Sequence, residues 1–125
     1  MSQTGTEIRA RLDEFRALKD GWLEGHGMAP RHEDLDWLAT QFEHHYPAGL
    51  PAPRLYPTEQ GGVQAEWRIG PNDISLEFDL ASKQGEWHHL NDETDLEESQ
   101  TLNLGSEAGW QWLARRIAEL AETGT

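Results

Sequence analysis

The sequence predicts one α+β domain, and three observations support this. Apolar residues recur at helical spacing in two segments near the start of the chain and in one near its end. Between them, apolar and polar residues alternate along neighbouring segments, as in strands with one buried face. The 125 residues suit a single core. We expect one domain over residues 1–125, ordered from about 6 to 121, with two N-terminal helices, an antiparallel sheet of about four strands and a C-terminal helix packed on one sheet face.

The first helix is expected from Thr6 to the pair Asp20-Gly21. Its apolar residues are spaced by four, three and three positions: Ile8, Leu12, Phe15 and Leu18. The segment 21–30 (GWLEGHGMAP) follows as a shaped loop, because three glycines in seven positions oppose a helix.

The second helix is expected to begin near Pro30, since proline is tolerated in a first helical turn, and to stop at Tyr46-Pro47. Prolines then make residues 47–58 an extended connector. The last helix follows Ser106, with apolar residues spaced by three, four and three: Trp110, Leu113, Ile117 and Leu120.

The strands are expected in the middle of the chain. Residues 63–69 and 74–80 alternate strictly, and the turn 70–73 joins them into an antiparallel hairpin with one dry and one wet face. Residues 86–90 form a third strand. Residues 91–98 are expected to be an acidic loop, 101–104 a further strand, and Leu55 and Tyr56 a short edge strand.

The charge is strongly negative and unevenly distributed. The net charge is −13, and residues 55–114 carry −10 of it, with 12 acids against only Arg68 and Lys83. Such a field repels nucleic-acid phosphates and anionic lipid, so we expect neither direct nucleic-acid binding nor membrane binding. It favours solubility and would steer a basic protein towards the chain.

Two groups of carboxylates are candidates for binding such a partner. Four are expected to share the wet face of the sheet: Glu66, Glu77, Asp79 and Glu86. Three more belong to the segment 92–98, which has five carboxylates in seven residues: Asp92, Glu93 and Asp95. Together they could present phosphate-like charge to a basic site on another protein. A solvated sheet face and a solvated loop would give the same pattern.

No residue pattern predicts catalysis, a metal or a cofactor. The chain has no cysteine, no GxSxG and no phosphate-binding glycine motif. Its histidines include the adjacent pairs His44-His45 and His88-His89, but neighbours on a strand point to opposite faces and cannot easily share a metal ion. We therefore assign no catalytic residue, no metal ligand and no cofactor.

Six tryptophans are many for a chain of this length. Trp37, Trp67 and Trp110 fall on faces that are expected to be buried. The other three are open between core packing and an exposed patch beside carboxylates, which would suit protein binding. They are Trp22, Trp87 and Trp112.

Two motifs give the chain a family resemblance. The first is Gly21-Trp22-Leu23 with Gly25, Gly27 and Pro30, and the second runs from Tyr56-Pro57-Thr58 through Gly61-Gly62-Val63-Gln64 to Glu66-Trp67. Together they resemble GWLxGxGxxP and YPTxxGGVQxEW motifs of a family of small bacterial proteins with no assigned activity. The resemblance covers roughly residues 8 to 113. It implies a compact bacterial cytoplasmic protein encoded beside a partner gene, and it supplies no catalytic residues.

These observations favour a non-catalytic acidic protein-binding module, such as an antitoxin, an immunity protein or an accessory protein, which engages a basic partner. The alternative is a small hydrolase or ligand-binding protein with Glu66, Glu77 or His88 in a pocket. A third option is a homo-oligomer joined through an edge strand. The absence of cysteine and of an apolar N-terminal run leads us to expect a cytoplasmic location.

Overall fold

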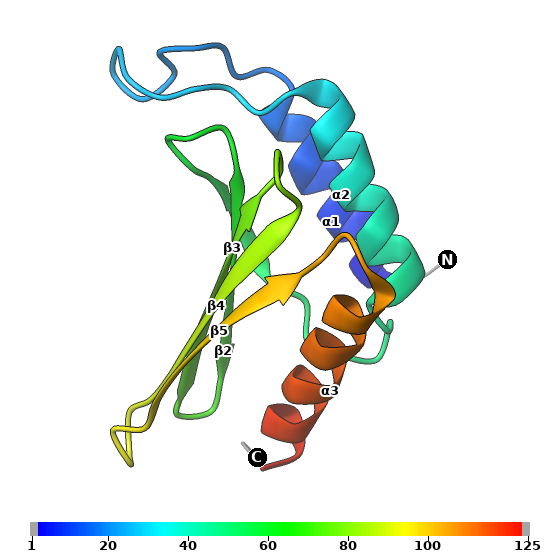
Figure 1. The fold of residues 1–125 in the computed structure, drawn as a ribbon, viewed down its shortest axis with the longest axis vertical. Helices are drawn as coiled ribbons and strands as arrows, with labels where there is room; N and C mark the ends of the chain where they lie inside the picture. The colour runs from blue at the N-terminus through cyan, green and yellow to red at the C-terminus, as the bar shows by residue number, and fades with distance from the viewer. Residues whose placement is uncertain (1–2, 124–125) are drawn as a thin grey trace.

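The structure is a computed structural model that describes residues 3–123. Within these residues the elements follow in the order α1 (Gln3–Phe15), α2 (His32–His45), β1 (Arg54–Pro57), β2 (Val63–Ile69), β3 (Asn72–Asp79), β4 (Gln84–Asn91), β5 (Glu97–Asn103) and α3 (Glu107–Thr123). All three helices lie on one side of a single sheet (Figure 1). The α+β class, the two N-terminal helices and the C-terminal helix on the sheet are confirmed.

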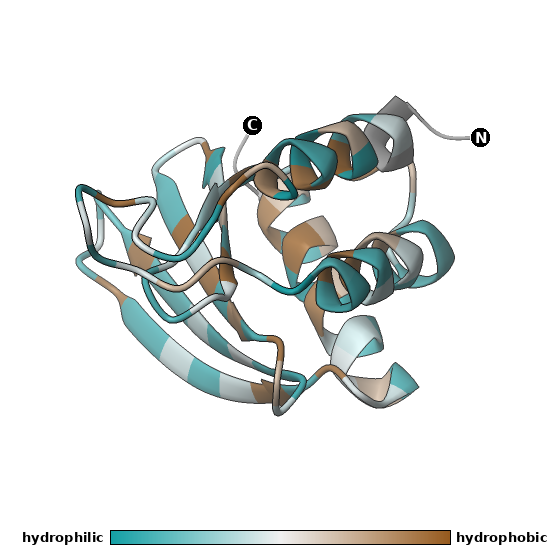
Figure 2. Cartoon of the chain, turned by 90° about the horizontal axis from the view of Figure 1, so that it is seen from above, coloured by the Kyte–Doolittle hydropathy of each residue, from teal (hydrophilic) through white to brown (hydrophobic). Residues whose placement is uncertain are grey.

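The sheet is an antiparallel meander with strand order β1-β2-β3-β4-β5. The expected hairpin forms β2 and β3, with Trp67 opposite Ile74 and Gln64 opposite Glu77. Because side chains alternate across a strand, this register places every apolar residue of the hairpin towards the helices. The colour bands along the strands in Figure 2 show this alternation.

The sheet has five strands, not about four. The short strand at Leu55 and Tyr56 does form, as β1. The last strand begins at Glu97, four residues before the expected Thr101, so part of the predicted acidic loop is strand. The sequence hides this strand because residues 97–101 are polar on both faces, and main-chain pairing with β4 defines it instead.

The first helix is shorter at its C-terminal end than its apolar spacing predicts. It ends at Phe15, and the bonds from Arg16, Ala17 and Leu18 reach back three residues, as in a tight terminal turn. The ring of His32 hydrogen-bonds the carbonyl of Arg16, at 3.1 Å. The carboxylate of Asp20 accepts the amide of Ala29, at 2.9 Å. Because of these contacts, residues 16–20 lead into the glycine loop and do not form another turn of the helix.

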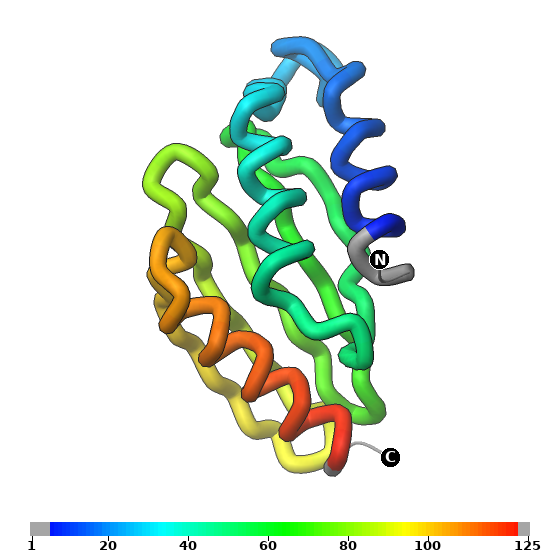
Figure 3. The backbone as a smooth tube through the Cα atoms, turned by 90° about the vertical axis from the view of Figure 1, so that its right-hand side faces the viewer, coloured from blue at the N-terminus to red at the C-terminus, as the bar shows by residue number. Residues whose placement is uncertain are grey.

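The core lies between the sheet and the helices and is built on aromatic rings. Phe42 of α2 packs edge-on against Trp110 of α3 with ring centroids 5.1 Å apart, and Trp110 stacks on Phe78 of β3 at 6.2 Å. Trp87 of β4 is fully buried. Figure 3 shows α1 and α2 side by side and α3 towards the other edge of the sheet. Each fully buried large side chain stabilises the fold by roughly 1.5–3 kcal/mol.

The tryptophans belong mainly to this core. Trp67 and Trp110 are buried as expected, but Trp37 is only half-buried, because it lies at the rim of the core under the ammonium group of Lys83, 5.5 Å from its ring centroid. Trp22 and Trp112 are also half-buried. None of the six is an exposed side chain, so they form no surface patch.

No membrane-crossing segment stands out in residues 3–123, where every helix is too short or too polar to traverse a bilayer.

We predict that Gly109→Ala destabilises the protein, because α3 begins so close to β5 that a Cβ at this position would lie 2.1 Å from the carbonyl oxygen of Asn103. The main chain would have to shift, at a cost of about 1–3 kcal/mol in the free energy of unfolding. Urea denaturation measures this. Gly49→Ala is the matched control, since nothing lies within 4 Å of a Cβ there, and its effect should stay within about 0.5 kcal/mol. Equal effects of the two substitutions would contradict the prediction.

Candidate functional site

The face of the sheet that points away from the helices is uncovered. We call it the open face. Its residues are the outward ones of β2 to β5: Gln64, Glu66, Arg68, Asp73, Ser75, Glu77, Asp79, Gln84, Glu86, His88, Leu90, Glu97, Ser99, Thr101 and Asn103. All are polar or charged except Leu90. The four carboxylates expected on the wet face, namely Glu66, Glu77, Asp79 and Glu86, all lie on it.

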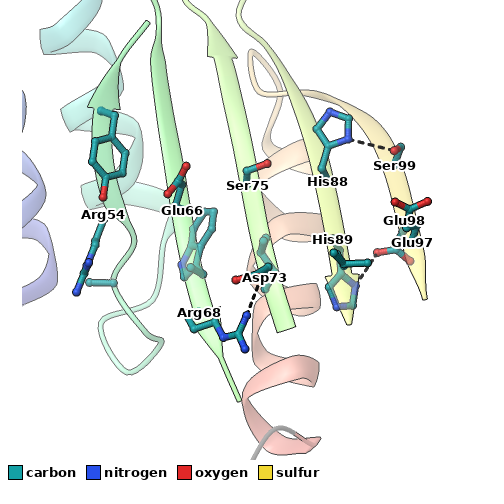
Figure 4. Close-up of a pocket in the computed structure, with 15 residues that line it drawn as sticks. Arg54, Glu66, Arg68, Asp73, Ser75, His88, His89, Glu97, Glu98 and Ser99 are labelled. Carbon is teal, nitrogen blue, oxygen red and sulfur yellow. Dashed lines mark hydrogen bonds and ion pairs between the residues drawn. The ribbon is translucent and has the colours of Figure 1, made fainter. Parts of the chain in front are cut away.

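A shallow groove of about 760 Å³ crosses the open face from β1 to β5 (Figure 4). One residue of each strand forms its central row, which runs Arg54, Glu66, Ser75, His88, Ser99. The small side chain of Ser75 lies in the middle of this row and leaves the floor open. Of the residues proposed for a pocket, the groove therefore contains Glu66 and His88, while Glu77 lies outside it.

The segment 55–114 has two basic residues, Arg68 and Lys83, and neither contacts a glutamate of the open face. Arg68 forms ion pairs with Asp73 and with Asp92, each at 2.6 Å. Lys83 lies over the ring of Trp37 on the helix side. Arg54 is opposite Glu66 in the register, yet the two do not form an ion pair.

Four glutamates on the open face consequently have no cationic partner in the part of the chain that the structure describes: Glu66, Glu77, Glu86 and Glu97. Glu77 is directly opposite Glu86 on the neighbouring strand. Like charges in this position destabilise a sheet. Their remaining contacts are to neutral groups, since Gln64 donates to Glu66 at 2.7 Å and the hydroxyl of Thr101 donates to Glu86 at 3.1 Å.

Asp79 lies on the open face but has a structural use. Its Oδ1 accepts the main-chain amides of Ala81 and Ser82, at 3.1 and 3.2 Å. These bonds shape the turn between β3 and β4. We therefore remove Asp79 from the group of free carboxylates.

The acidic segment 92–98 also contains both carboxylates that the fold uses and carboxylates that are exposed. Asp92 is held by Arg68, whereas Glu93 and Asp95 are exposed in the turn between β4 and β5. This turn is built by Asn91, whose side-chain oxygen accepts the amides of Glu93 and Thr94. Glu98, the last acid of the segment, points to the helix side of the sheet.

Glu98 belongs to a partly buried polar cluster that was not predicted from the sequence. Its carboxylate accepts hydrogen bonds from the indole of Trp87, at 3.0 Å, and from Arg116 of α3, at 3.1 Å. His89 lies beside it, 3.8 Å away, and is 2% exposed. The alternation along β4 could have indicated this cluster. His89 is two residues after the buried Trp87, so both side chains point to the same face of the strand.

The hydrogen bonds define the protonation of His89. The amide nitrogen of Asn72 donates to the carbonyl of Ile69, so its Oδ1 is the acceptor that faces Nε2 of His89, at 2.8 Å. Nε2 therefore carries the hydrogen, and the buried Nδ1 has no hydrogen-bond partner. Burial and the nearby charge of Arg116 lower the pKa of His89, against an opposing effect of Glu98, so the ring is neutral at neutral pH.

Glu98 has a lowered pKa as well. Burial acts to raise the pKa of its carboxyl, but the hydrogen bonds from Arg116 and Trp87 outweigh that effect. The cluster thus places an ionised carboxylate and the side chain of Arg116 next to a neutral imidazole. Its contacts tie β4, β5 and α3 together, which is a structural use.

The groove does not contain a triad of serine, histidine and carboxylate within residues 3–123. Nδ1 of His88 is 3.1 Å from the hydroxyl of Ser99, which resembles a nucleophile beside a base. A hydrolase of that type also needs a group that orients the imidazole, and no carboxylate in residues 3–123 lies within ion-pair distance of His88. The same residues contain no cluster of three or more side chains that could hold a metal ion.

Comparisons with protein-family models, curated proteins and solved structures find no match for the chain. The motif resemblance therefore stays a prediction. The structure does bring its two motifs together, since the amide of Met28 donates to the carbonyl of Glu59 at 2.7 Å.

We predict that His89 makes the stability pH-dependent. Because the folded pKa is below the ordinary value of 6.5, the unfolded chain takes up the proton first. The contribution of His89 is complete above pH 6.5 and is lost as the pH falls from 6.5 towards the folded pKa. The free energy of unfolding, measured in urea at pH 7.5 and 5.5, should fall less in His89→Gln than in the wild type.

His88→Gln is the control for this measurement, because His88 is the exposed neighbour on the same strand. It should keep the pH dependence of the wild type. The assignment would be wrong if His89→Gln and His88→Gln had the same slope as the wild type.

Proposed function

We propose that this chain is a non-catalytic protein-binding module whose open face engages a basic partner protein. The observation that carries the proposal is the group of four exposed glutamates on the open face, Glu66, Glu77, Glu86 and Glu97, which no cation of the described chain neutralises. A fold gains nothing from two glutamates opposite each other, because like charges in this position destabilise a sheet. A cation supplied by a partner would remove that destabilisation.

The distribution of charge supports the same role. The segment 55–114, which contains β2 to β5 and all of β1 except Arg54, carries −10 of the total charge. Such a field accelerates the encounter with a basic protein and disfavours acidic competitors. Antitoxins, immunity proteins and accessory proteins are the kinds of module that use a face of this type. A cytoplasmic location remains part of the proposal.

Charge reversal tests the proposal. We predict that Glu77→Lys combined with Glu86→Lys abolishes capture of a basic protein from the native host lysate, because the open face then repels it. The wild type should retain this protein at low salt and lose it as salt rises, since exposed charges are screened. Mass spectrometry of the retained proteins is the measurement.

A second double variant serves as the control. Glu7→Lys on α1 combined with Glu59→Lys in the loop after β1 changes two exposed glutamates away from the open face. Both double variants move the net charge from −13 to −9, because each exchange adds two charges. Capture that survives the open-face variant, or that both variants lose equally, would overturn the proposal.

The groove favours a second candidate, a site for a small polar ligand. It offers Arg54 and Glu66 on neighbouring strands, with the hydroxyls of Ser75 and Ser99 further along the same row. A ligand that carries both an anionic and a cationic group, such as a free amino acid, fits this chemistry. Binding should shift the NMR signals of Ser75 and His88.

We predict that Ser75→Trp abolishes those shifts, because the indole fills the centre of the groove. Gln84→Trp places the same side chain on the open face outside the groove and should leave the shifts unchanged. A screen of amino acids that gives no shifts in the wild type would eliminate this second candidate.

A further inference from the structure

The two edges of the sheet differ in how their main-chain groups are satisfied. At the β1 edge the strand has only four residues, with Pro53 before it and Pro57 at its end. Proline has no N–H to offer a further strand. The carbonyl of Leu55 points outward, and Arg11 of α1 donates to it at 3.0 Å. This edge is therefore closed.

The β5 edge is longer and open. Two main-chain hydrogen bonds, both 2.9 Å long, lie at the two ends of its pairing with β4. The amide of Asn91 donates to the carbonyl of Leu96, and the amide of Leu104 donates to the carbonyl of Lys83. In an antiparallel ladder, alternate residues bond to the partner strand. The even-numbered residues of β5 therefore face β4, and the odd-numbered ones direct their N–H and C=O groups away from the sheet.

Three of these outward residues are unused. The carbonyl of Asn103 accepts the amide and the hydroxyl of Ser106, which closes that end of the edge. Glu97, Ser99 and Thr101 have no hydrogen bond on their outward main-chain groups within residues 3–123. An extended segment placed beside them could form a regular antiparallel ladder with the sheet.

The charges next to this edge select the kind of segment. Glu97 is exposed at one end of the edge, and Thr101 continues the row of Glu77 and Glu86 across the open face. Glu98 points to the other side and is already paired with Arg116. Positive side chains on the open-face side of a sixth strand would meet uncompensated carboxylates. On the helix side, Arg116 disfavours them.

A second copy of this chain is the poorer occupant. Each copy has a net charge of −13, and β5 contains two glutamates and no basic residue. Charged residues on an edge strand are a usual means of preventing self-association. Here the same charges attract a basic strand.

We infer that the β5 edge binds an extended segment of the partner as a sixth strand, with lysine or arginine at alternate positions facing the open face. The inference rests on the proposed function and adds the mode of binding to it. Main-chain bonds to Glu97, Ser99 and Thr101 would give affinity, and the alternating charges would give selectivity.

The probe for this inference is a synthetic ten-residue peptide in which lysine alternates with threonine. Its binding should slow hydrogen exchange of the amides of Glu97, Ser99 and Thr101 in the wild-type protein. The same peptide with N-methyl groups on every second amide keeps its charge but loses its donors on one edge, and it should bind at least about tenfold more weakly. Equal affinity for both peptides would overturn the inference.

A pair of variants tests the same point from the protein side. Ser99→Pro removes an outward N–H without removing a ladder bond, so edge geometry tolerates it. Ser99→Ala keeps the N–H and removes only the hydroxyl that contacts His88. Peptide affinity should fall at least about tenfold in Ser99→Pro and less than about twofold in Ser99→Ala. If Ser99→Pro is unfolded by circular dichroism, the N-methyl comparison on the wild type decides.

The outcomes separate this inference from the proposed function. Peptide binding that is lost in the double reversal of Glu77 and Glu86, but is unaffected by N-methylation and by Ser99→Pro, would overturn the edge mode and leave the open-face module standing. A second result would also overturn the inference. If light scattering showed that the protein alone is a dimer, and hydrogen exchange showed that its β5 amides exchange slowly, a second copy would already occupy the edge.

Discussion

One-sided coverage of the sheet is the constraint on which the other features of the molecule depend. Every helix packs on the same face, so strict alternation along the strands sends half of their side chains into the core and half into water. The register that buries Trp67, Leu76 and Trp87 is the register that places Glu66, Glu77 and Glu86 outside. The core and the open face are therefore two consequences of a single alignment, and a slip by one residue would destroy both.

The sequence is most informative where this alternation is strongest. The hairpin of β2 and β3 could be predicted almost to its ends because its apolar and polar residues do not deviate from a period of two. The start of β5 could not, since residues 97–101 are polar on both faces and pair through the main chain. For the same reason the sequence predicts a loop at Glu98, although this residue is a strand residue and a partly buried partner of Trp87 and Arg116.

The candidate site was predicted in position but not in detail. Four carboxylates were placed on the correct face from their parity alone. Parity cannot show which of them the fold itself uses, because that depends on contacts made across turns. Asp79 is used by the turn that follows it, and Asp92 by Arg68 of another strand. What distinguishes Glu77 and Glu86 is that neither binds a cation or a turn amide within residues 3–123, which only a structure can display.

The uneven use of cations argues for a binding role more strongly than the total charge does. Here Arg68 serves Asp73 and Asp92, Lys83 lies on a tryptophan behind the sheet, and Glu77 stays opposite Glu86. Glu66, Glu77 and Glu86 thus have no cationic partner on a face that no helix covers. This face also adjoins the edge whose main-chain groups are free, so one basic strand could satisfy both the charges and the hydrogen bonds.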